Sequence, residues 1–249
     1  MFSFFQKNVY LQDLIPPEYV DIHSHLLPGI DDGAQKFEDT TLLLKGLADI
    51  GFSEFVTTPH IMHNVYENTF KSVTELHKKT VEDLAGVQFN APFRAAAEYM
   101  LDDNFMTHLH SGSLLTLADK YVLIEMSYLN PPLQLFDIIF DIQVAGYIPV
   151  LAHPERYNFY HTNFGQYQKL KNAGCKFQVN LLSTVGYYGS NVMQAASKLL
   201  HAGLIDFTGS DVHHEKHLNA FAQKLSVKNS EPLKEAMKNN HLFKIKNFV

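Results

Sequence analysis

Short apolar segments recur seven times along the chain, and ionisable side chains stand where most of them end. The segments, which we interpret as strands, are Tyr19–His25, Glu54–His60, Phe93–Glu98, Tyr121–Met126, Ile148–His153, Lys176–Asn180 and Asp206–Asp211. Most are separated by stretches with the periodicity of amphipathic helices, namely Phe37–Ile50, Phe70–Leu84, Leu133–Ala145, Gln166–Ala173, Val192–His201 and Glu215–Leu225. This alternation implies parallel strands joined by right-handed crossovers, in a closed barrel or an open sheet.

The position of the polar residues favours the barrel. The histidines and acids that close or directly follow the apolar runs are His23, His25, His60, Glu98, Glu125, His153 and Asp211. In a parallel barrel the C-terminal strand ends converge on one mouth, where active sites are built. An open sheet would gather fewer of these side chains around one point. We therefore predict an α/β fold of the TIM-like (β/α) barrel type, with a site at the C-terminal strand ends.

Composition narrows the class of protein. The 249 residues contain no linker-like stretch, so we expect one domain over residues 1–249, with residues 1–18 as an extension before the first strand. The formal net charge is −6 and no long Lys/Arg run occurs, which disfavours a nucleic-acid partner. Cys175 is the only cysteine, and no stretch is long and apolar enough to span a bilayer. We expect a cytoplasmic protein without membrane insertion.

Two short motifs carry the strongest chemical signal. In Asp21-Ile22-His23-Ser24-His25 the two histidines are two residues apart, so on a strand both imidazoles point to the same side and reach one ion. Asp211 and His213 share that spacing near the other end of the chain. Imidazole and carboxylate ligands without thiolate suit manganese, iron or zinc rather than a structural cysteine-type zinc site.

Each piece also has a simpler explanation when it is taken alone. His60 fits a core histidine, Glu98 fits a buried partner for Arg94, and a carboxylate after an apolar run is often a helix N-cap. The simpler explanations must hold for all the pieces together, however. Several ionisable groups buried at successive strand ends are costly unless they are paired or bound to metal. The joint pattern therefore predicts a metal site.

The motifs resemble those of a known superfamily. They are His-Ser-His-Leu-Leu-Pro-Gly-Ile-Asp-Asp-Gly at residues 23–33, Thr57-Thr58-Pro59-His60, Ala97-Glu98, Leu123-Ile124-Glu125, the run from Ala152 to Tyr157 and Gly209-Ser210-Asp211-Val212-His213. The first is similar to the opening motif of the PHP (polymerase and histidinol phosphatase) superfamily. The whole set resembles its bacterial manganese-dependent tyrosine phosphatases of capsule and exopolysaccharide operons, from about Val20 to His213.

This resemblance implies a distorted seven-stranded barrel with three transition-metal ions, manganese first, with iron or zinc as alternatives. The implied ligands are His23, His25, Glu98 and Asp211 for one ion, Asp32, His60 and His213 for a second, and Glu98, Glu125 and His153 for a third. Arg156 resembles the family arginine that grips phosphate, and with His153 and Asp211 it makes up the implied catalytic set.

The chain departs from the family pattern in two places. A further arginine often follows the Asp-x-His motif, but here the segment reads His214-Glu215-Lys216-His217-Leu218-Asn219. Lys216 and His217 are the candidate substitutes. The extension over residues 1–18 is longer than in the shortest family members, and we assign it no role.

The resemblance and the residues together predict a metal-dependent phosphoric monoester hydrolase, namely a protein-tyrosine phosphatase that uses a metal-activated hydroxide. The expected partner is a phosphotyrosine protein, the tail of a bacterial tyrosine kinase of polysaccharide synthesis and export. A cysteine-based mechanism is disfavoured, because the position six residues after Cys175 is Leu181 and not arginine. An aspartyl-phosphate mechanism is also disfavoured, because the chain has no Asp-x-Asp motif.

Three other functions stay open at this point, as does a homo-oligomeric state. They are a small-molecule phosphatase of the histidinol-phosphate type, a phosphodiesterase or exonuclease of the same superfamily, and a non-catalytic metal-binding scaffold. Aromatic residues near the expected mouth either stack on a phosphotyrosine ring or pack the loops. They are Tyr66, Tyr99, Tyr128, Tyr157, Phe159, Tyr160, Tyr187 and Tyr188.

Overall fold

The structure is a computed structural model that describes residues 8–244. Within that range the strands are β1 (Tyr19–Asp21), β2 (Phe52–Thr57), β3 (His60–Ile61), β4 (Phe93–Ala95), β5 (Glu98–Met100), β6 (Tyr121–Glu125), β7 (Ile148–Ala152), β8 (Lys176–Asn180) and β9 (Phe207–Gly209). The α-helices are α1 (Phe37–Ile50), α2 (Phe70–Gly86), α3 (Phe105–His110), α4 (Leu135–Val144), α5 (Gly165–Asn172), α6 (Ser190–His201), α7 (Glu215–Ala220) and α8 (Glu231–Asn239). Short 3₁₀-helices are η1 (Gln12–Leu14), η2 (Pro154–Arg156), η3 (Asn158–Tyr160), η4 (Leu181–Val185) and η5 (Asn240–Phe243).

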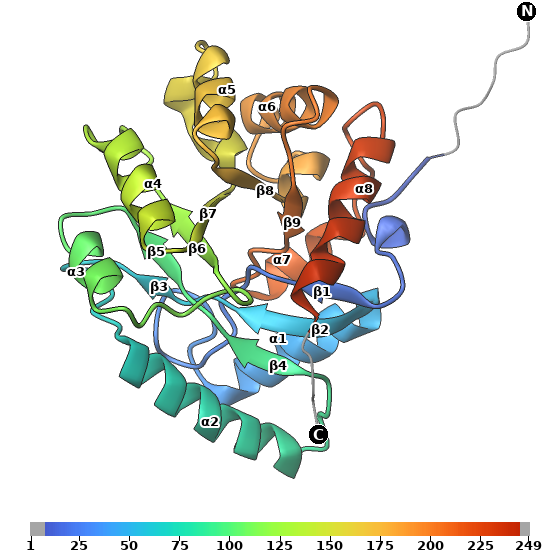
Figure 1. The fold of residues 1–249 in the computed structure, drawn as a ribbon. Helices are drawn as coiled ribbons and strands as arrows, with labels where there is room; N and C mark the ends of the chain where they lie inside the picture. The colour runs from blue at the N-terminus through green and yellow to red at the C-terminus, as the bar shows by residue number, and fades with distance from the viewer. Residues whose placement is uncertain (1–7, 245–249) are drawn as a thin grey trace, which may run out of the picture.

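The strands form two parallel sheets with helices around them (Figure 1). The smaller sheet has the order β1-β2-β4, and the larger has the order β3-β5-β6-β7-β8-β9. Every strand pair in these ladders is parallel, as the alternation of strands and helices predicts. The α/β class with parallel strands is therefore confirmed.

A closed seven-stranded barrel is not confirmed within residues 8–244, where nine strands lie in two sheets. The predicted strand Glu54–His60 divides into β2 and β3, and Phe93–Glu98 divides into β4 and β5. Pro59 explains the first break, because it has no N–H to donate to a ladder. The N-terminal pieces pair in the small sheet and the C-terminal pieces in the large one.

Beyond the ladders, the segment after the first strand, β1, pairs with the segment after the last strand, β9. The segment that follows β1 makes an isolated parallel bridge between Ser24 and Val212, just after β9. The N–H of His25 donates to the carbonyl of Val212 at 3.0 Å, and the N–H of Asp211 donates to the carbonyl of His23 at 2.7 Å. These bonds place the His-x-His and Asp-x-His motifs side by side.

Helix α1 illustrates how the sequence sets the elements. Leu43, Leu44 and Leu47 are spaced for one helix face, and all three are buried in the core. The helix ends where Gly51 adopts a left-handed conformation (φ 114°), and its N–H bonds to the carbonyls of Leu47 and Ala48. The bounds of α1 agree with the prediction. Helices α3 and α8 were not predicted, and α7 is shorter than the predicted Glu215–Leu225.

The described part of the N-terminal extension packs onto the domain. Leu11 is completely buried, and its N–H donates to the carbonyl of Gln223 at 3.1 Å. The N–H of Leu225 donates to the carbonyl of Val9, and Tyr10 bridges Lys224 in antiparallel fashion. Residues 1–7 of the predicted extension lie outside the described residues. Among the described residues, no helix is long and apolar enough to cross a membrane.

Candidate metal centre

The structure brings the nine predicted ligands into one connected cluster. They lie at strand ends and in the loops between strands: His23 and His25 after β1, Asp32 in the next loop, His60 at the start of β3, Glu98 at the start of β5, Glu125 at the end of β6, His153 after β7, and Asp211 and His213 after β9. Because parallel strands end at the same edge, residues far apart in the chain meet there. Their role as ligands stays a prediction.

Four atoms converge at the base of the cluster. The Nε2 atom of His23 lies 3.2 Å from Oε2 of Glu98 and 3.3 Å from Oδ1 of Asp211. The Nε2 atom of His25 lies 3.4 Å from each of the same two oxygens. All four residues are buried. This is the group that the resemblance implies for the first ion.

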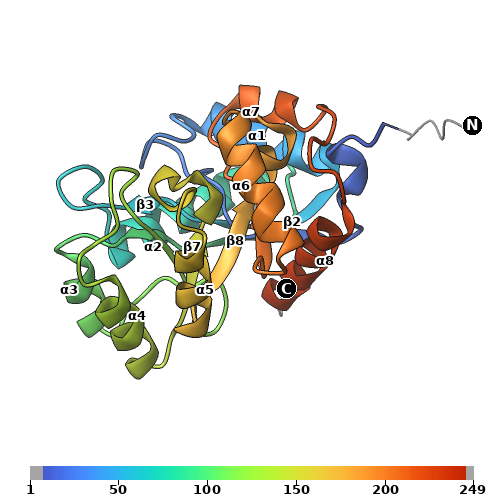
Figure 2. The same ribbon diagram turned by 90° about the horizontal axis from the view of Figure 1, so that it is seen from above.

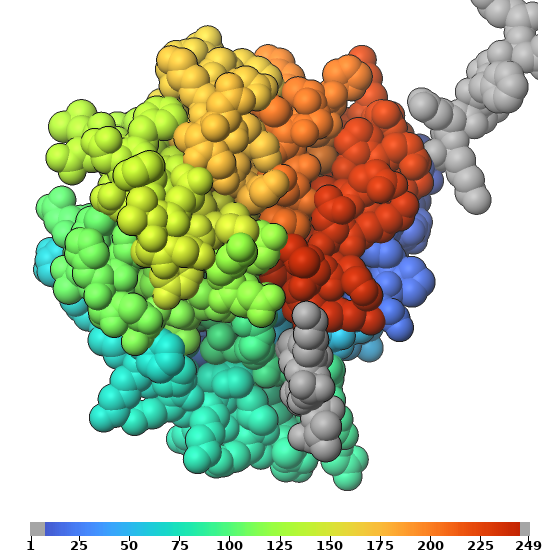
Figure 3. All heavy atoms as spheres, viewed as in Figure 1, coloured from blue at the N-terminus to red at the C-terminus, as the bar shows by residue number. Residues whose placement is uncertain are grey.

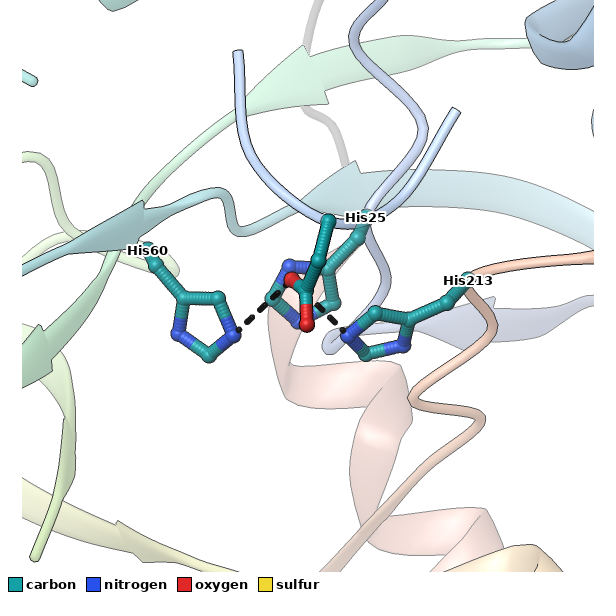
Figure 4. Close-up of side chains that lie close together, drawn as sticks. His25, His60 and His213 are labelled. Atoms are coloured by element: carbon teal, nitrogen blue, oxygen red, sulfur yellow. Dashed lines mark ion pairs between the residues drawn. The ribbon is translucent and has the colours of Figure 1, made fainter. Parts of the chain in front are cut away.

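A second group lies nearer the solvent. One carboxylate oxygen of Asp32 is 3.5 Å from Nε2 of His60 and 3.6 Å from Nε2 of His213. Figure 4 shows His60 and His213 turned toward this carboxylate from opposite sides, with His25 behind it. The rings of His25 and His213 are stacked, with centroids 3.9 Å apart. Asp32, His60 and His213 are the residues implied for the second ion.

The third group surrounds the other side of His60. Its Nδ1 atom lies 2.8 Å from Oε1 of Glu125 and 3.2 Å from Oε2 of Glu98. The Nε2 atom of His153 lies 3.1 Å from Oε1 of Glu98. His60 thus faces both the second and the third group, which the sequence did not indicate.

Unpaired buried atoms test whether this centre fits metal ions. His60 Nδ1, Glu98 Oε2 and Glu125 Oε1 are buried and have no hydrogen-bond partner. The His60 nitrogen nevertheless lies 3.2 Å from the Glu98 oxygen and 2.8 Å from the Glu125 oxygen. Buried polar atoms in folded proteins are nearly always satisfied. Imidazole nitrogens and carboxylate oxygens that converge without hydrogen bonds fit a cation that accepts their lone pairs. The residues present therefore fit a centre of transition-metal ions.

Two further residues orient the histidines, and the sequence analysis did not assign them. Asp31 Oδ2 lies 2.7 Å from Nδ1 of His25, and the same carboxylate accepts hydrogen bonds from the N–H groups of Gly33 and His60. Burial raises the pKa of Asp31, but the His25 imidazole and these bonds lower it to about 2. Gln178 Oε1 lies 2.8 Å from Nδ1 of His23. With Nδ1 engaged, each histidine presents Nε2 to the centre.

A signal for both orienting residues was present in the sequence. Gln178 is a polar residue between Phe177 and Val179 in an apolar strand, and it is completely buried. Asp31 is one of two consecutive aspartates. The sequence could not show which of the two faces the ions and which supports His25.

Two of the predicted ligands have strained backbones. His153 (φ 34°) and Asp211 (φ 51°) adopt the left-handed region, which disfavours residues other than glycine. Such conformations cost about 1–3 kcal/mol and persist where the surroundings hold them. Here they turn two side chains at strand ends toward the cluster.

Arg156 lies beside the cluster. Its Nη1 donates to Oδ2 of Asp211 at 2.8 Å, and its guanidinium lies 4.9 Å from the ring centroid of Tyr128 and 4.4 Å from that of Tyr188. Burial lowers the pKa of Arg156, but the carboxylate of Asp211 raises it above its ordinary value overall. The stacked rings and the ion pair hold a permanent positive charge next to the ligands.

A pocket of about 850 Å³ opens onto the cluster and Arg156. Tyr66, Tyr128 and Tyr188 line it, whereas Tyr99, Tyr157 and Tyr160 are buried in the packing. Packing therefore accounts for the buried members, and stacking on a phosphotyrosine ring stays a prediction for those that line the pocket. His217 lines the pocket, and its Nδ1 accepts the N–H of His213 at 3.1 Å. Lys216, the other predicted substitute for the second arginine, is exposed and not part of the lining.

Fold and site together define an α/β protein whose parallel strand ends carry a His/Asp/Glu centre fit for metal ions, beside an arginine in an aromatic pocket. The chain belongs to the capsular polysaccharide synthesis CpsB/CapC family, whose sequence model matches residues 19–235. This confirms the resemblance that its motifs indicate.

Named relatives and a solved structure agree with this family assignment. The chain is 31% identical over 205 residues to the tyrosine-protein phosphatase YwqE of Bacillus subtilis, covering 82% of this chain and 81% of YwqE. It is 28% identical over 208 residues to the tyrosine-protein phosphatase CpsB of Streptococcus pneumoniae, covering 78% and 83%. A crystal structure from a study of YwqE and CpsB, described as unique metal-dependent tyrosine phosphatases, superposes with a TM-score of 0.81 at 29% identity. The match covers 90% of this chain and 93% of that one.

Proposed function

We propose that the protein is a metal-dependent protein-tyrosine phosphatase. One observation carries the proposal: unpaired imidazole and carboxylate atoms converge beside Arg156, in a pocket lined by tyrosines. The names of the relatives, YwqE and CpsB, support the same chemistry. The whole reaction would lie within one domain that includes the described part of the extension.

The proposed centre holds three transition-metal ions, with manganese as the first choice. His23, His25, Glu98 and Asp211 would hold one, Asp32, His60 and His213 a second, and Glu98, Glu125 and His153 a third. When bound, such ions neutralise phosphate oxygens and lower the pKa of a water molecule toward neutrality.

The chain's own side chains bind and orient the phosphate monoester. Arg156 presents N–H donors in a planar fork that suits phosphate oxygens, and the rings of Tyr128 and Tyr188 both contact its guanidinium. The buried Asp31 and Gln178 keep His25 and His23 in one orientation. The phenolic leaving group has a pKa near 10, so its departure needs only modest help from an acid.

The proposed substrate is a phosphotyrosine in a flexible protein segment, the tail of a bacterial tyrosine kinase of polysaccharide export. This partner would place the protein in the cytoplasm, and a homo-oligomer is compatible with it. A planar phenyl phosphate on a mobile segment fits an open pocket of this volume.

Side-by-side turnover tests the proposal. Manganese-loaded protein should hydrolyse a phosphotyrosine peptide faster than a phosphoserine peptide of the same sequence, because the shorter side chain cannot place both backbone and phosphate. Histidinol phosphate and a nucleic-acid diester complete the set. If either is turned over with a kcat/KM at least about tenfold above the best phosphotyrosine peptide, the substrate claim fails while the metal-dependent class stands.

Arg156→Ala separates phosphate recognition from metal binding. The variant should lose about 1.5–3 kcal/mol of transition-state binding, read as a raised KM or a lowered kcat, because charge-assisted bonds to phosphate disappear. Elemental analysis should show unchanged metal content. Arg156→Lys is the matched control, since it keeps the charge without the fork and should recover part of the loss. Loss of metal in Arg156→Ala would assign Arg156 to holding Asp211 instead.

A further inference from the structure

Helix α4 is apolar on both of its sides. Leu135, Ile138, Ile139 and Ile142 are buried against the sheet. The opposite side carries exposed Phe136, Phe140 and Val144, preceded by Leu133 and Leu129. We call these five exposed residues the α4 face. A surface helix of a globular protein normally carries a single apolar side, which faces the core.

The exposure of the α4 face is large. Leu129 is 85% exposed, Leu133 is fully exposed, and Phe140 and Val144 are 64% and 70% exposed. Seen from two directions, α4 lies between α3 and α5 at the outside of the molecule (Figures 1 and 2). The space-filling view shows the yellow-green part of the chain that contains it at the surface (Figure 3). Large exposed apolar side chains gathered along one helix and the segment before it are typical of an interaction site.

The α4 face is continuous with the candidate site. Leu129 belongs to the lining of the pocket, as do Asn130 and Pro132, and Leu133 follows directly in the chain. The same loop starts at Glu125, a predicted ligand at the end of β6, and leads into the first turn of α4. Leu129 therefore belongs both to the pocket lining and to the α4 face.

Charge and size point away from a second copy of this chain as the occupant. Helix α4 carries Asp137 and Asp141 and no basic residue, so two copies packed through it would bring like charges together without a counter-ion. Five side chains offer a few hundred Å², below the roughly 800 Å² per partner of a stable interface. The ten residues of α4 span about 15 Å, the length of about five extended residues.

We propose that the α4 face docks the substrate protein itself, as an extended segment of about five residues next to the phosphotyrosine, with apolar side chains at alternate positions. Alternate side chains of an extended segment point to one side, which suits an apolar helix face. This inference rests on the proposed phosphatase function and names the sequence class that its site selects.

Peptides of matched sequence test the proposal. Manganese-loaded protein is assayed with free phosphotyrosine and with two phosphotyrosine peptides that carry five residues on each side, in which leucine or alanine alternates with serine. The leucine peptide should have a kcat/KM at least about tenfold above the alanine peptide, as expected when at least one leucine side chain is buried. Equal values for the two peptides would overturn the proposal.

Variants locate the preference on the molecule. Phe140→Gln combined with Val144→Gln should abolish the preference for leucine and leave turnover of free phosphotyrosine unchanged, and Leu133→Gln alone should weaken it. Leu42→Gln, on an exposed position of α1, is the matched control and should keep the preference. A preference that survives the double variant overturns the assignment to α4. The assignment is also overturned if the double variant changes only the sedimentation of the protein, because the α4 face would then mediate contacts between copies.

The two proposals fail in different ways. If the wild-type protein hydrolyses neither free phosphotyrosine nor either peptide, the phosphatase function is wrong and docking of this substrate falls with it. If all three are hydrolysed without a flank preference, the phosphatase function stands and the docking proposal alone is wrong.

Discussion

Glu98 occupies the centre of the ligand cluster. Its Oε2 lies 3.2 Å from nitrogen atoms of His23 and His60, and its Oε1 lies 3.1 Å from His153. Burial raises the pKa of Glu98, but the surrounding imidazoles lower it well below its ordinary value overall. A carboxylate with both oxygens engaged in this way is suited to bridge two cations.

We predict that Glu98→Gln removes more than one ion per chain, because the amide replaces an oxygen shared between two groups of ligands. Elemental analysis of the purified variant measures this against the wild type. Glu67→Gln, an exposed glutamate outside the cluster, is the control and should keep the full metal content. A wild-type protein that holds at most one ion at saturating metal would contradict the prediction.

Cys175 lies at the other end of strand β8 from the cluster. Burial raises the pKa of its thiol to about 12, so it stays protonated and is not a nucleophile at neutral pH. Asn180, at the opposite end of the same strand, donates to Oδ2 of Asp211 at 2.8 Å. The strand therefore separates the thiol from the chemistry by its whole length.

Cys175→Ser should accordingly retain phosphatase activity within a few-fold, while a chelator abolishes the activity of both proteins. Cys175→Ala provides a second variant in case the buried hydroxyl impairs folding. Loss of turnover in a folded variant that still carries its metal would overturn a mechanism based on the metal centre.

The loop between β1 and α1 shows how one segment positions several residues of the cluster at once. It carries His25, Asp31 and Asp32, and it turns back on itself at Gly33. A Cβ atom on Gly33 would lie 2.2 Å from the carbonyl oxygen of His25 and 2.4 Å from its Cβ. Only glycine fits this close approach of two backbone segments.

We predict that Gly33→Ala lowers both the stability and the metal content, because the loop must shift to relieve the contact. Overpacking of this kind costs about 1–3 kcal/mol. Gly86→Ala is the matched control: nothing lies within 4 Å of its added Cβ at the end of α2, so it should keep or raise the stability. Urea unfolding and elemental analysis measure the two effects. Equal behaviour of the two variants would show that the loop adjusts freely.

Sequence periodicity predicted where strands and helices lie better than it predicted where one strand ends and the next begins. The apolar runs located all the strands and six of the helices, because burial on one face leaves a pattern. The division at Pro59 depends on which backbone groups pair with which neighbour, which is a tertiary property. Helix α3 has only six residues, too few for a clear periodic signal. The outward apolar side of α4 is exposed and is not covered by another element of the described chain.

At the scale of the whole molecule, most of the cluster was predictable because its members close or directly follow the apolar runs of the sequence, although His60 and Glu98 begin β3 and β5 in the structure. Chemistry and position indicated seven of the nine residues, the family resemblance supplied Asp32 and His213 as the other two, and the structure brings all nine together. What supports them was not predictable: Gln178 on β8 orients His23 from 155 positions away in the chain. Likewise, Ser210 donates to Asp21 at 2.6 Å, tying the end of β9 to β1.

The same arrangement predicts that the stability of the fold depends on bound metal ions. Asp211, Glu98 and Glu125 are buried carboxylates, and charges at such positions are costly unless they are paired or bound to metal. Ions that bind only the folded chain stabilise it by about 2.7 kcal/mol at a free concentration one hundred times their Kd. For a chain of this size, each kcal/mol shifts the thermal midpoint by about 2–4 °C.

Removal of the metal should therefore lower the thermal midpoint by about 5–10 °C, and added manganese should restore it. Calorimetry with and without a chelator measures the shift, and elemental analysis confirms that the ions have left. Glu98→Gln should start from a lower midpoint and respond less to the chelator, because fewer ions remain to be removed. Cys175→Ser should respond like the wild type, since its substitution lies at the far end of β8. An unchanged midpoint in wild-type protein stripped of its metal would mean that the cluster is already satisfied by its own ion pairs.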